Sequence, residues 1–193
     1  FYLSDYIKEI KNVSGAIRIV NNDIYFENLT GENHKGIIKI TSDTGSNINN
    51  FNVNIECSRI KVEVPEVELQ TEADINGKLV GNYKRPVFKG VAFVSNANFT
   101  YPPLKPQKKS TYNPNAVYPV WDADVIIREN VRYRYPLVDI ELDKGNKLHF
   151  YGDKFNIVVT GVLTTRNGKI TYLSQKFDID YADMSVNSAA GVP

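Results

Sequence analysis

Acidic residues that could hold a calcium ion or act as an acid/base pair occur at two places in the sequence. They are Asp139, Glu141 and Asp143 at one place and Asp178, Asp180 and Asp183 at the other. Residues at i and i+2 share one face of a β-strand, so both chemistries are conceivable. The sequence has no Asp-x-Asp-x-Asp-Gly loop that would support calcium. The favoured interpretation is a solvated strand face whose carboxylates pair across strands with Arg132, Arg134 and Lys144.

The histidines and the cysteine indicate neither catalysis nor metal binding. His34 and His149 are far apart and have Lys35 and Lys147 nearby, and the apolar neighbours of His149 predict that it faces solvent. Cys57 is the single cysteine, which excludes an internal disulfide and a structural zinc cluster. The sequence also lacks a Gly-rich phosphate loop and a supported Ser/His/Asp or Cys/His arrangement. We therefore expect no enzyme, no metal and no cofactor.

Two segments combine basic and aromatic residues. Arg132–Tyr135 interleaves them as a platform for single-stranded nucleic acid would. In a strand, however, both tyrosines share the face of Val131 and the arginines lie opposite, as a sheet with one apolar side requires. Because the net charge is only +1, we expect no nucleic-acid partner. Lys105, Lys108 and Lys109 belong to a loop that either meets lipid headgroups or a partner, or is simply solvated.

The element that must position all these residues is the β-strand, because apolar and polar residues alternate through most of the chain. The 193 residues are 42% hydrophobic and 11% aromatic, which excludes intrinsic disorder. Alternating segments are 53–57, 60–64, 73–79, 125–127, 138–142, 148–150, 155–159 and 177–181. A period of two places one face of each strand on a core and the other in water, so the sequence predicts an all-β fold.

Other segments depart from this alternation. Residues 1–12 carry apolar residues at helical spacing, which predicts either a short N-terminal helix or a frayed end. Residues 101–119 contain five prolines and are interpreted as a long loop or a boundary. An apolar-x-Gly pattern, followed by a second glycine and a new apolar strand, begins at positions 29, 79 and 159. This weak repeat predicts stacked hairpins.

Hairpins with one apolar face must hide that face, either against a second sheet or by curling around something apolar. Composition favours neither arrangement. The chain starts at Phe1 without an initiator Met or a signal-peptide pattern, and after Val186 it has no closing element. We therefore expect residues 1–193 to be a fragment of a larger protein whose targeting signal or membrane anchor lies outside it.

Two blocks of the sequence carry a more specific pattern of strands and glycines. The first comprises Ile60 to Pro65, Leu69 with Ala73-Asp74-Ile75, Leu79-Val80-Gly81, Pro86 and Gly90-Val91-Ala92-Phe93. The second runs from Trp121-Asp122-Ala123-Asp124-Val125 through Gly145-Asn146-Lys147-Leu148, Gly152, Val159-Thr160-Gly161 and Gly168-Lys169-Ile170-Thr171-Tyr172 to Phe177-Asp178-Ile179. Both blocks resemble the C-terminal domain of the TamB family, in the AsmA-like, bridge-like lipid transfer group of envelope proteins. Residues 1–50 fit only the generic strand repeat, and the loop from Leu104 to Tyr118 departs from the family pattern.

The resemblance implies a β-taco, in which long, curled antiparallel or mixed sheets enclose a continuous hydrophobic groove. Residues 1–50 would then be an N-terminal β-repeat and residues 51–193 the TamB-like region. It also implies a lipid conduit in the periplasm of a diderm bacterium, which carries phospholipid between the inner and outer membranes and supports outer-membrane biogenesis and protein assembly. The parent chain would be anchored in the inner membrane and would engage an Omp85-type outer-membrane barrel.

The predicted groove lining consists of apolar strand positions that present surface and perform no chemistry. It comprises Ile60, Val62, Val64, Leu69, Ile75, Leu79, Val91, Phe93, Val125, Ile127, Val138, Ile140, Leu142, Phe150, Ile157, Val159, Leu163, Ile170, Phe177 and Ile179. These residues would contact phospholipid acyl chains, with about 0.8 kcal/mol for each buried CH₂. Two other functions stay open. One is a structural or adhesive β-sandwich or β-solenoid binding domain on a cell surface, and the other is a scaffold that hands strands to an assembly barrel through open sheet edges.

Overall fold

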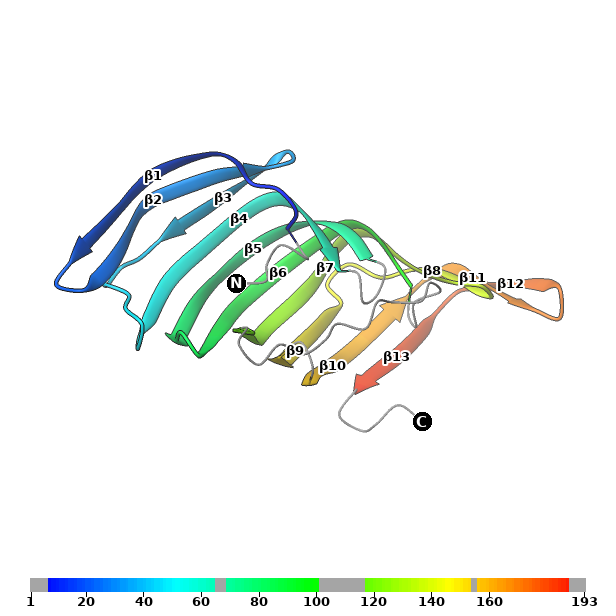
Figure 1. The fold of residues 1–193 in the computed structure, drawn as a ribbon. Coiled ribbons are helices and arrows are strands. Elements are labelled where there is room, and N and C mark those ends of the chain that lie inside the picture. The colour runs from blue at the N-terminus through cyan, green and yellow to red at the C-terminus, as the bar shows by residue number, and fades with distance from the viewer. Residues whose placement is uncertain (1–6, 65–68, 101–116, 154–155, 188–193) are drawn as a thin grey trace.

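The computed structural model describes residues 7–64, 69–100, 117–153 and 156–187. These residues form strands and connecting turns and no helix, which confirms the all-β prediction (Figure 1). The strands are β1 (Lys11–Val20), β2 (Asp23–Asn33), β3 (Gly36–Thr41), β4 (Phe51–Val64), β5 (Leu69–Asn82), β6 (Arg85–Phe99), β7 (Val120–Tyr135), β8 (Val138–Glu141), β9 (Lys147–Asp153), β10 (Asn156–Thr165), β11 (Asn167–Tyr172), β12 (Gln175–Ile179) and β13 (Ala182–Asn187).

All of these strands belong to one sheet, which is not closed. From β1 to β6 each strand pairs antiparallel with the next, and β6 and β7 are parallel. The N-terminal half of β7 pairs with β9 and its C-terminal half with β8. The sheet continues from there as two branches, β9–β10–β13 and β8–β11–β12. The sheet is therefore mixed, which is one of the two arrangements that the resemblance implied.

The two branches are halves of the same interrupted strands. Residues 142–146 separate β8 from β9, Arg166 separates β10 from β11, and residues 180–181 separate β12 from β13. The first two glycine repeats are the hairpins β2–β3 and β5–β6, as predicted. The hairpin predicted at the third glycine repeat is wrong, because β10 and β11 run in the same direction and do not pair with each other. Gly161 in β10 pairs with β9, and Gly168 in β11 pairs with β8.

The N-terminal helix is not found in the described residues. Residues 7–10 have no regular structure, and β1 begins at Lys11 and pairs with β2 as far as Val20. The helix prediction is wrong there, because pairing with β2 satisfies the backbone of a segment whose helical spacing is weak. Residues 1–6 and residues 101–116, the greater part of the proline-rich segment with its three lysines, lie outside the described residues.

The strands lie side by side and arch across the sheet, with β1 at one end and β12 and β13 at the other (Figure 1). The chain exposes 12515 Å² of accessible surface. A compact monomer of 21.8 kDa would expose about 9,300 Å² by the usual scaling of area with mass. An open sheet, with no second layer among the described residues, predicts an excess of this sign.

Candidate functional site

One face of the sheet carries mostly apolar side chains. Partner residues in neighbouring strands point to the same face, and so do residues two apart in one strand. One row of partners runs from β4 to β13 through Cys57, Ile75, Ala92, Val125, Leu148, Gly161 and Val186. We call the face that carries this row the apolar face, and the opposite one the charged face. Of the buried hydrophobic residues that the structure describes, all except Val120 lie on the apolar face.

All but two of the predicted lining residues lie on the apolar face. The register places there Ile60, Val62, Val64, Leu69, Ile75, Leu79, Val125, Ile127, Val138, Ile140, Phe150, Ile157, Val159, Leu163, Ile170, Phe177 and Ile179. Leu142 lies between β8 and β9 and packs in the same buried cluster as Ile127 and Leu163. Val91 and Phe93 lie on the charged face, because β6 presents Phe88, Ala92 and Val94 to the partners of the apolar row.

Four aromatic residues of the apolar face are absent from the predicted groove lining, although the alternation did place Tyr133 on this face. Phe88 and Trp121 pair across β6 and β7, and their ring centroids are 5.6 Å apart. Phe99 and Tyr133 pair farther along the same strands at 5.2 Å. The alternation in the sequence could have identified the others. Each of these aromatic residues lies either an even number of positions from an apolar residue of the alternating pattern, or on the far side of a bulge from it. The apolar face is therefore partly aromatic at β6 and β7.

On the charged face, Phe93 lies under a guanidinium group. The Cζ atom of Arg128 lies 4.4 Å from the centroid of the Phe93 ring, and Arg128 also pairs with Asp74 of β5. A cation over the ring and a carboxylate beside it let an aromatic side chain stand among charges. The hydrogen bond from the backbone N–H of Arg59 lowers the pKa of Asp74 most, and the side chain of Arg128 lowers it further.

A line of β-bulges crosses the sheet and divides the apolar face into two halves. The register shifts between Cys57 and Ile60 in β4 and after Val94 in β6. Asn96 and Asn130 take left-handed φ angles of 53° and 54°, and Asn130 Nδ2 donates to Asn96 Oδ1 at 3.0 Å. The interruptions at residues 142–146, 166 and 180–181 continue this line through the last strands. We call the line the crease; an extra residue in one strand bends that strand, so aligned bulges bend the whole sheet.

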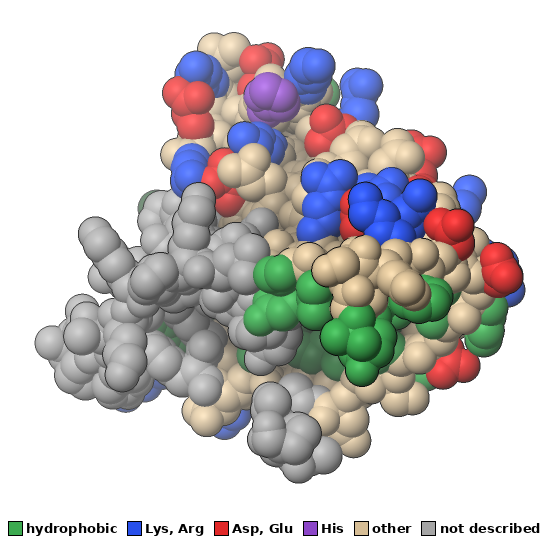
Figure 2. Space-filling view, turned by 90° about the vertical axis from the view of Figure 1, so that its right-hand side faces the viewer, with side chains coloured by type: hydrophobic (Ala, Val, Ile, Leu, Met, Phe, Trp, Pro, Cys, Tyr) green, Lys and Arg blue, Asp and Glu red, His purple; other side chains and the backbone are tan. Residues whose placement is uncertain are grey.

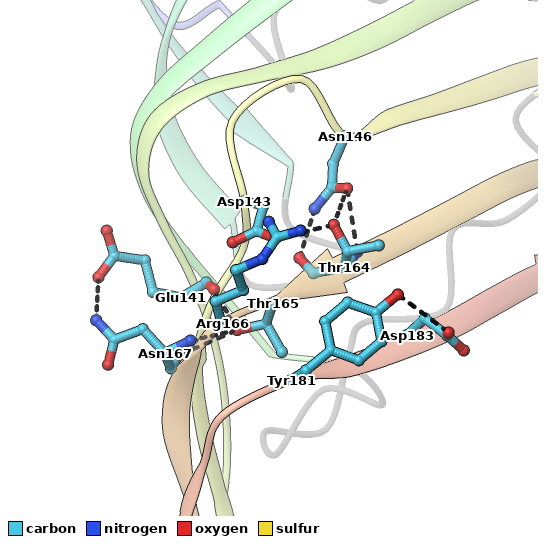
Figure 3. Close-up of polar contacts among 9 residues, drawn as sticks. All are labelled: Glu141, Asp143, Asn146, Thr164, Thr165, Arg166, Asn167, Tyr181 and Asp183. Atoms are coloured by element: carbon cyan, nitrogen blue, oxygen red, sulfur yellow. Dashed lines mark hydrogen bonds and ion pairs between the residues drawn. The ribbon is translucent and has the colours of Figure 1, made fainter.

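Buried polar side chains tie the crease together between β8–β9 and β10–β11 (Figure 3). Asn146 Nδ2 donates to the carbonyl oxygen of Thr164 at 2.7 Å, and the N–H of Thr164 donates to Asn146 Oδ1 at 3.0 Å. Thr165 Oγ1 donates to the carbonyl oxygen of Glu141 at 2.6 Å. These bonds replace the ladder hydrogen bonds that the interruption removes.

Asp143 also belongs to this crease. Its Oδ2 atom lies 2.7 Å from Nη1 of Arg166 and accepts from Thr164 Oγ1 at 3.1 Å (Figure 3). The Arg166 guanidinium lies 5.8 Å from the Tyr181 ring centroid. Among the predicted basic partners, Lys144 is therefore not the one that Asp143 uses, because Arg166 approaches from the neighbouring interrupted strand.

The other acidic residues of the first group pair as predicted. Arg132 Nη2 lies 3.0 Å from Asp139 Oδ1, and Arg132 Nη1 lies 3.6 Å from Glu141 Oε2. Arg134 Nε lies 3.6 Å from Asp139 Oδ1. These residues share the charged face of β7 and β8. The prediction of cross-strand ion pairs is confirmed for both arginines, and pairs of this partly exposed kind contribute little to stability.

His149 faces the charged side, as predicted. Its Nδ1 lies 3.0 Å from Asp124 Oδ1 and its Nε2 lies 3.6 Å from Asp122 Oδ1. Lys147 Nζ lies 2.7 Å from Asp124 Oδ2, and this hydrogen bond, together with that of His149, lowers the pKa of Asp124. His34 is exposed beside the β2–β3 turn. Both histidines are thus polar surface residues.

The described part of the chain holds no group of three or more His, Cys, Asp or Glu residues that could bind a metal ion. A shallow hollow of about 330 Å³ lies on the charged face at the crease. It is lined by Asn96, Asn98, Asn130, Arg132, Arg134 and Glu141. A lining without Ser, Cys or His offers no nucleophile with a neighbouring base.

Large hydrophobic side chains remain exposed towards both ends of the sheet. β1 exposes Ile17 and Ile19, and the far end of the apolar face exposes Ile170, Phe177 and Met184, the last two at about half of their area. Figure 2 views the molecule from the side where β12 lies in Figure 1, and there hydrophobic side chains gather below a band of Lys and Arg. Contiguous exposed apolar patches on soluble proteins often mark interaction sites.

The comparisons with known proteins do not identify the chain. No family model, no curated protein and no solved structure matches it. Within the residues that the structure describes, no helix is both long enough and apolar enough to span a bilayer.

Proposed function

We propose that the apolar face is a hydrocarbon-binding surface and that the chain is a lipid-carrying domain of the TamB type. In this proposal the sheet curls as a β-taco, and the apolar face lines a groove for phospholipid acyl chains. The protein performs no chemistry on the lipid. It works in the cell envelope, between the inner and outer membranes, where an Omp85-type barrel is the proposed outer-membrane partner.

One observation carries the proposal: outside the bulges, no described strand residue of β3 to β13 on the apolar face is charged. Every Lys, Arg, Asp, Glu and His of these strands lies on the opposite face or in the crease. A charged group next to hydrocarbon would lose its hydration, at a cost of several kcal/mol. That cost is on the order of the free energy gained by burying a few methylenes. A continuous uncharged face is therefore the property that a hydrocarbon surface needs first.

The openness of the sheet supports the same proposal. A face already packed against a second protein layer would bury its large side chains, whereas Ile157, Ile170 and Phe177 are 40% to 50% exposed. Each methylene that such a surface shields from water contributes about 0.8 kcal/mol. An acyl chain that covers these residues would gain several kcal/mol in this way, without any specific polar contact.

A matched pair of substitutions on β10 tests the proposal. Ile157 and Val162 are both aliphatic and are 42% and 50% exposed, but Ile157 lies on the apolar face and Val162 on the charged face. The protein, Ile157→Asp and Val162→Asp are purified without detergent, and native mass spectrometry measures co-purifying phospholipid. Crosslinking to a phospholipid with a photoreactive acyl chain measures contact.

We expect phospholipid on the unsubstituted protein, an unchanged amount on Val162→Asp, and at least about a tenfold loss of crosslinking on Ile157→Asp, because a carboxylate opposes burial of the chain. Circular dichroism checks that both variants fold. Equal crosslinking of the two variants, or no phospholipid on the unsubstituted protein in both assays, would contradict the proposal and leave a binding domain of another kind, such as an adhesive one.

A further inference from the structure

A row of polar side chains crosses the charged face beside the crease. Successive partners in β4, β5, β6, β7, β8 and β11 are Glu63, Gln70, Asn98, Arg132, Glu141 and Asn167. We call them the planar row, because every side chain ends in a planar carboxylate, amide or guanidinium group. At the usual strand spacing of about 4.8 Å, the planar row is about 24 Å long.

The surface is hollowed along the planar row. The hollow of about 330 Å³ has Asn98, Arg132 and Glu141 in its lining, and a second hollow of about 180 Å³ has Gln70 in its lining. Asn96 lines both hollows, so they adjoin. We call the two together the trough; its lining comes from β4 to β8 and the β2–β3 turn. The larger hollow is at the low end of the size range of small-molecule sites, which is about 300 to 1,000 Å³.

Some side chains of the trough are held in place, and others are available to a ligand. Asn96 Nδ2 donates to Glu72 Oε2 at 3.2 Å, and Asn130 Nδ2 donates to Asn96 Oδ1 at 3.0 Å. Within the described part of the chain, the side-chain amides of Gln70 and Asn98 have no hydrogen-bond partner in the protein. An amide carries donors and an acceptor in one plane, so these two amides suit ligand groups that both donate and accept.

The charged side chains beside the trough are already paired. Arg132 Nη2 and Arg134 Nε lie 3.0 Å and 3.6 Å from Asp139 Oδ1. Lys61 Nζ lies 3.2 Å from Glu63 Oε1. A charged ligand would have to displace these partners, whereas a neutral ligand would not. The strands β5 to β7 also pair on both sides, which leaves no backbone edge for an added peptide strand.

We infer that the trough binds a linear, neutral oligosaccharide. A hydroxyl group both donates and accepts, and a planar amide, carboxylate or guanidinium group bonds two neighbouring hydroxyls of one sugar ring at once. The strand spacing is close to the length of one pyranose ring in an extended β-linked chain, so successive rings meet successive members of the planar row. Neither lining includes an aromatic residue, so a single sugar is held by few hydrogen bonds and binds weakly. The trough lies on the face opposite the apolar face, and the inference does not depend on the proposed function.

An NMR titration of the full chain, labelled with ¹⁵N, tests this inference. The probes are β-1,4-linked oligomers of glucose and of N-acetylglucosamine, from the monomer to the hexamer. A β-1,4-linked hexamer of mannuronate, which carries a carboxylate on each ring, is the anionic probe. The variants Gln70→Ala and Asn98→Ala remove the two available amides. The matched control is Asn76→Ala, because Asn76 is also exposed on the charged face of β5 but lies outside the trough.

We expect the side-chain amide signals of Gln70 and Asn98 to shift with at least one neutral series. For that series, Kd should fall at least about tenfold from the dimer to the pentamer and change little for the hexamer, because a row of about 24 Å holds about five rings. Each of the two alanine variants should weaken the pentamer about fivefold, the loss of one hydrogen bond, and Asn76→Ala should leave it unchanged.

Three results would overturn the inference. They are the absence of a shift in both amide signals with every neutral oligomer, equal weakening of the pentamer by Asn76→Ala and Asn98→Ala, and binding of the mannuronate hexamer more than about tenfold tighter than any neutral hexamer. The variant Ile157→Asp, on the apolar face, should bind the pentamer as the unsubstituted protein does. Failure of this inference therefore leaves the proposed function standing, and failure of the proposed function leaves the trough as a binding site.

Discussion

Among substitutions that change the side-chain volume little, replacement of Asn146 should destabilise the crease most. It lies between β8 and β9 and is 8% exposed. Its amide bonds both backbone groups of Thr164, in β10, and also accepts from the Thr164 hydroxyl at 2.9 Å. The Thr164 carbonyl has a second donor, the N–H of Asp143 at 2.9 Å, whereas within the described residues Asn146 Oδ1 is the acceptor that the structure gives the Thr164 N–H. The substitution Asn146→Ala would therefore leave mainly this one donor unsatisfied.

The expected loss of stability follows from these hydrogen bonds. An unsatisfied buried donor costs about 1 to 3 kcal/mol, and the other lost hydrogen bonds, which are partly compensated, add up to about 1 kcal/mol. We expect Asn146→Ala to lower the free energy of unfolding by about 2 to 3 kcal/mol. Urea unfolding, followed by tryptophan fluorescence of Trp121, measures it through the shift of the midpoint at constant m-value.

The control is Asn98→Ala, because Asn98 has the same side chain but is exposed on the charged face of β6. Surface substitutions of this kind change stability by less than about 0.5 kcal/mol. If Asn146→Ala unfolds at the same urea concentration as Asn98→Ala, the amide does not hold the interrupted strands together and the reasoning on the crease is refuted.

Two further predictions concern titrating groups. Arg59 and Arg128 lower the pKa of Asp74, so the stability that Asp74 contributes is complete above its unfolded value of about 3.9 and is lost as pH falls through the lower folded value. Asp74→Asn should therefore lose less stability than the unsubstituted protein between about pH 6 and about pH 2, as urea midpoints at each pH would show; equal losses would contradict this. Burial raises the pKa of the Cys57 thiol to about 11, and the thiolate is the reactive form. At about pH 8 alkylation of Cys57 should be on the order of a hundredfold slower than that of an exposed thiol, introduced as Ser58→Cys in a Cys57→Ala background; similar rates would show that Cys57 is accessible.

Strand faces could be predicted from the sequence because burial imposes a period of two wherever a strand is regular. Val62, Ile140 and Phe177 alternate with polar neighbours and lie on one face, as their periods indicate. The bulge in β4 was also visible, since the alternation of residues 53–57 resumes at Ile60 one position out of phase. The position of the crease could therefore be predicted in part from the sequence.

The faces of β6 could not be predicted in the same way, because apolar residues occupy both of its sides. Val91 and Phe93 alternate as well as Ala92 and Val94 do, and only pairing with β5 decides between the two sets. The two-residue turn at positions 83–84 would have set that register. The sequence does not show that a guanidinium from β7 covers Phe93, since that contact depends on the parallel pairing of β6 and β7.

Long-range pairing explains the remaining misses. Alternation indicates that a segment is a strand, but it does not indicate which strand lies beside it. The continuation of β10 into β11, and the pairing of Asp143 with Arg166 instead of Lys144, both follow from interruptions that line up across three neighbouring strands. Local patterns do not encode such an alignment.

The phase of the alternation at the bulges bears most directly on function. An extra residue moves every later side chain of its strand to the other face unless the sequence pattern shifts with it. In β4 and β6 the pattern does shift: Cys57 and Ile60, and likewise Val94 and Ala97, are three residues apart and both lie on the apolar face. The apolar face therefore stays uncharged on both sides of the crease. A shorter apolar patch would be enough for the sheet to bend. Continuity of this kind, on a sheet that leaves large apolar side chains in water at both ends, is what a linear hydrocarbon chain requires of the surface beneath it.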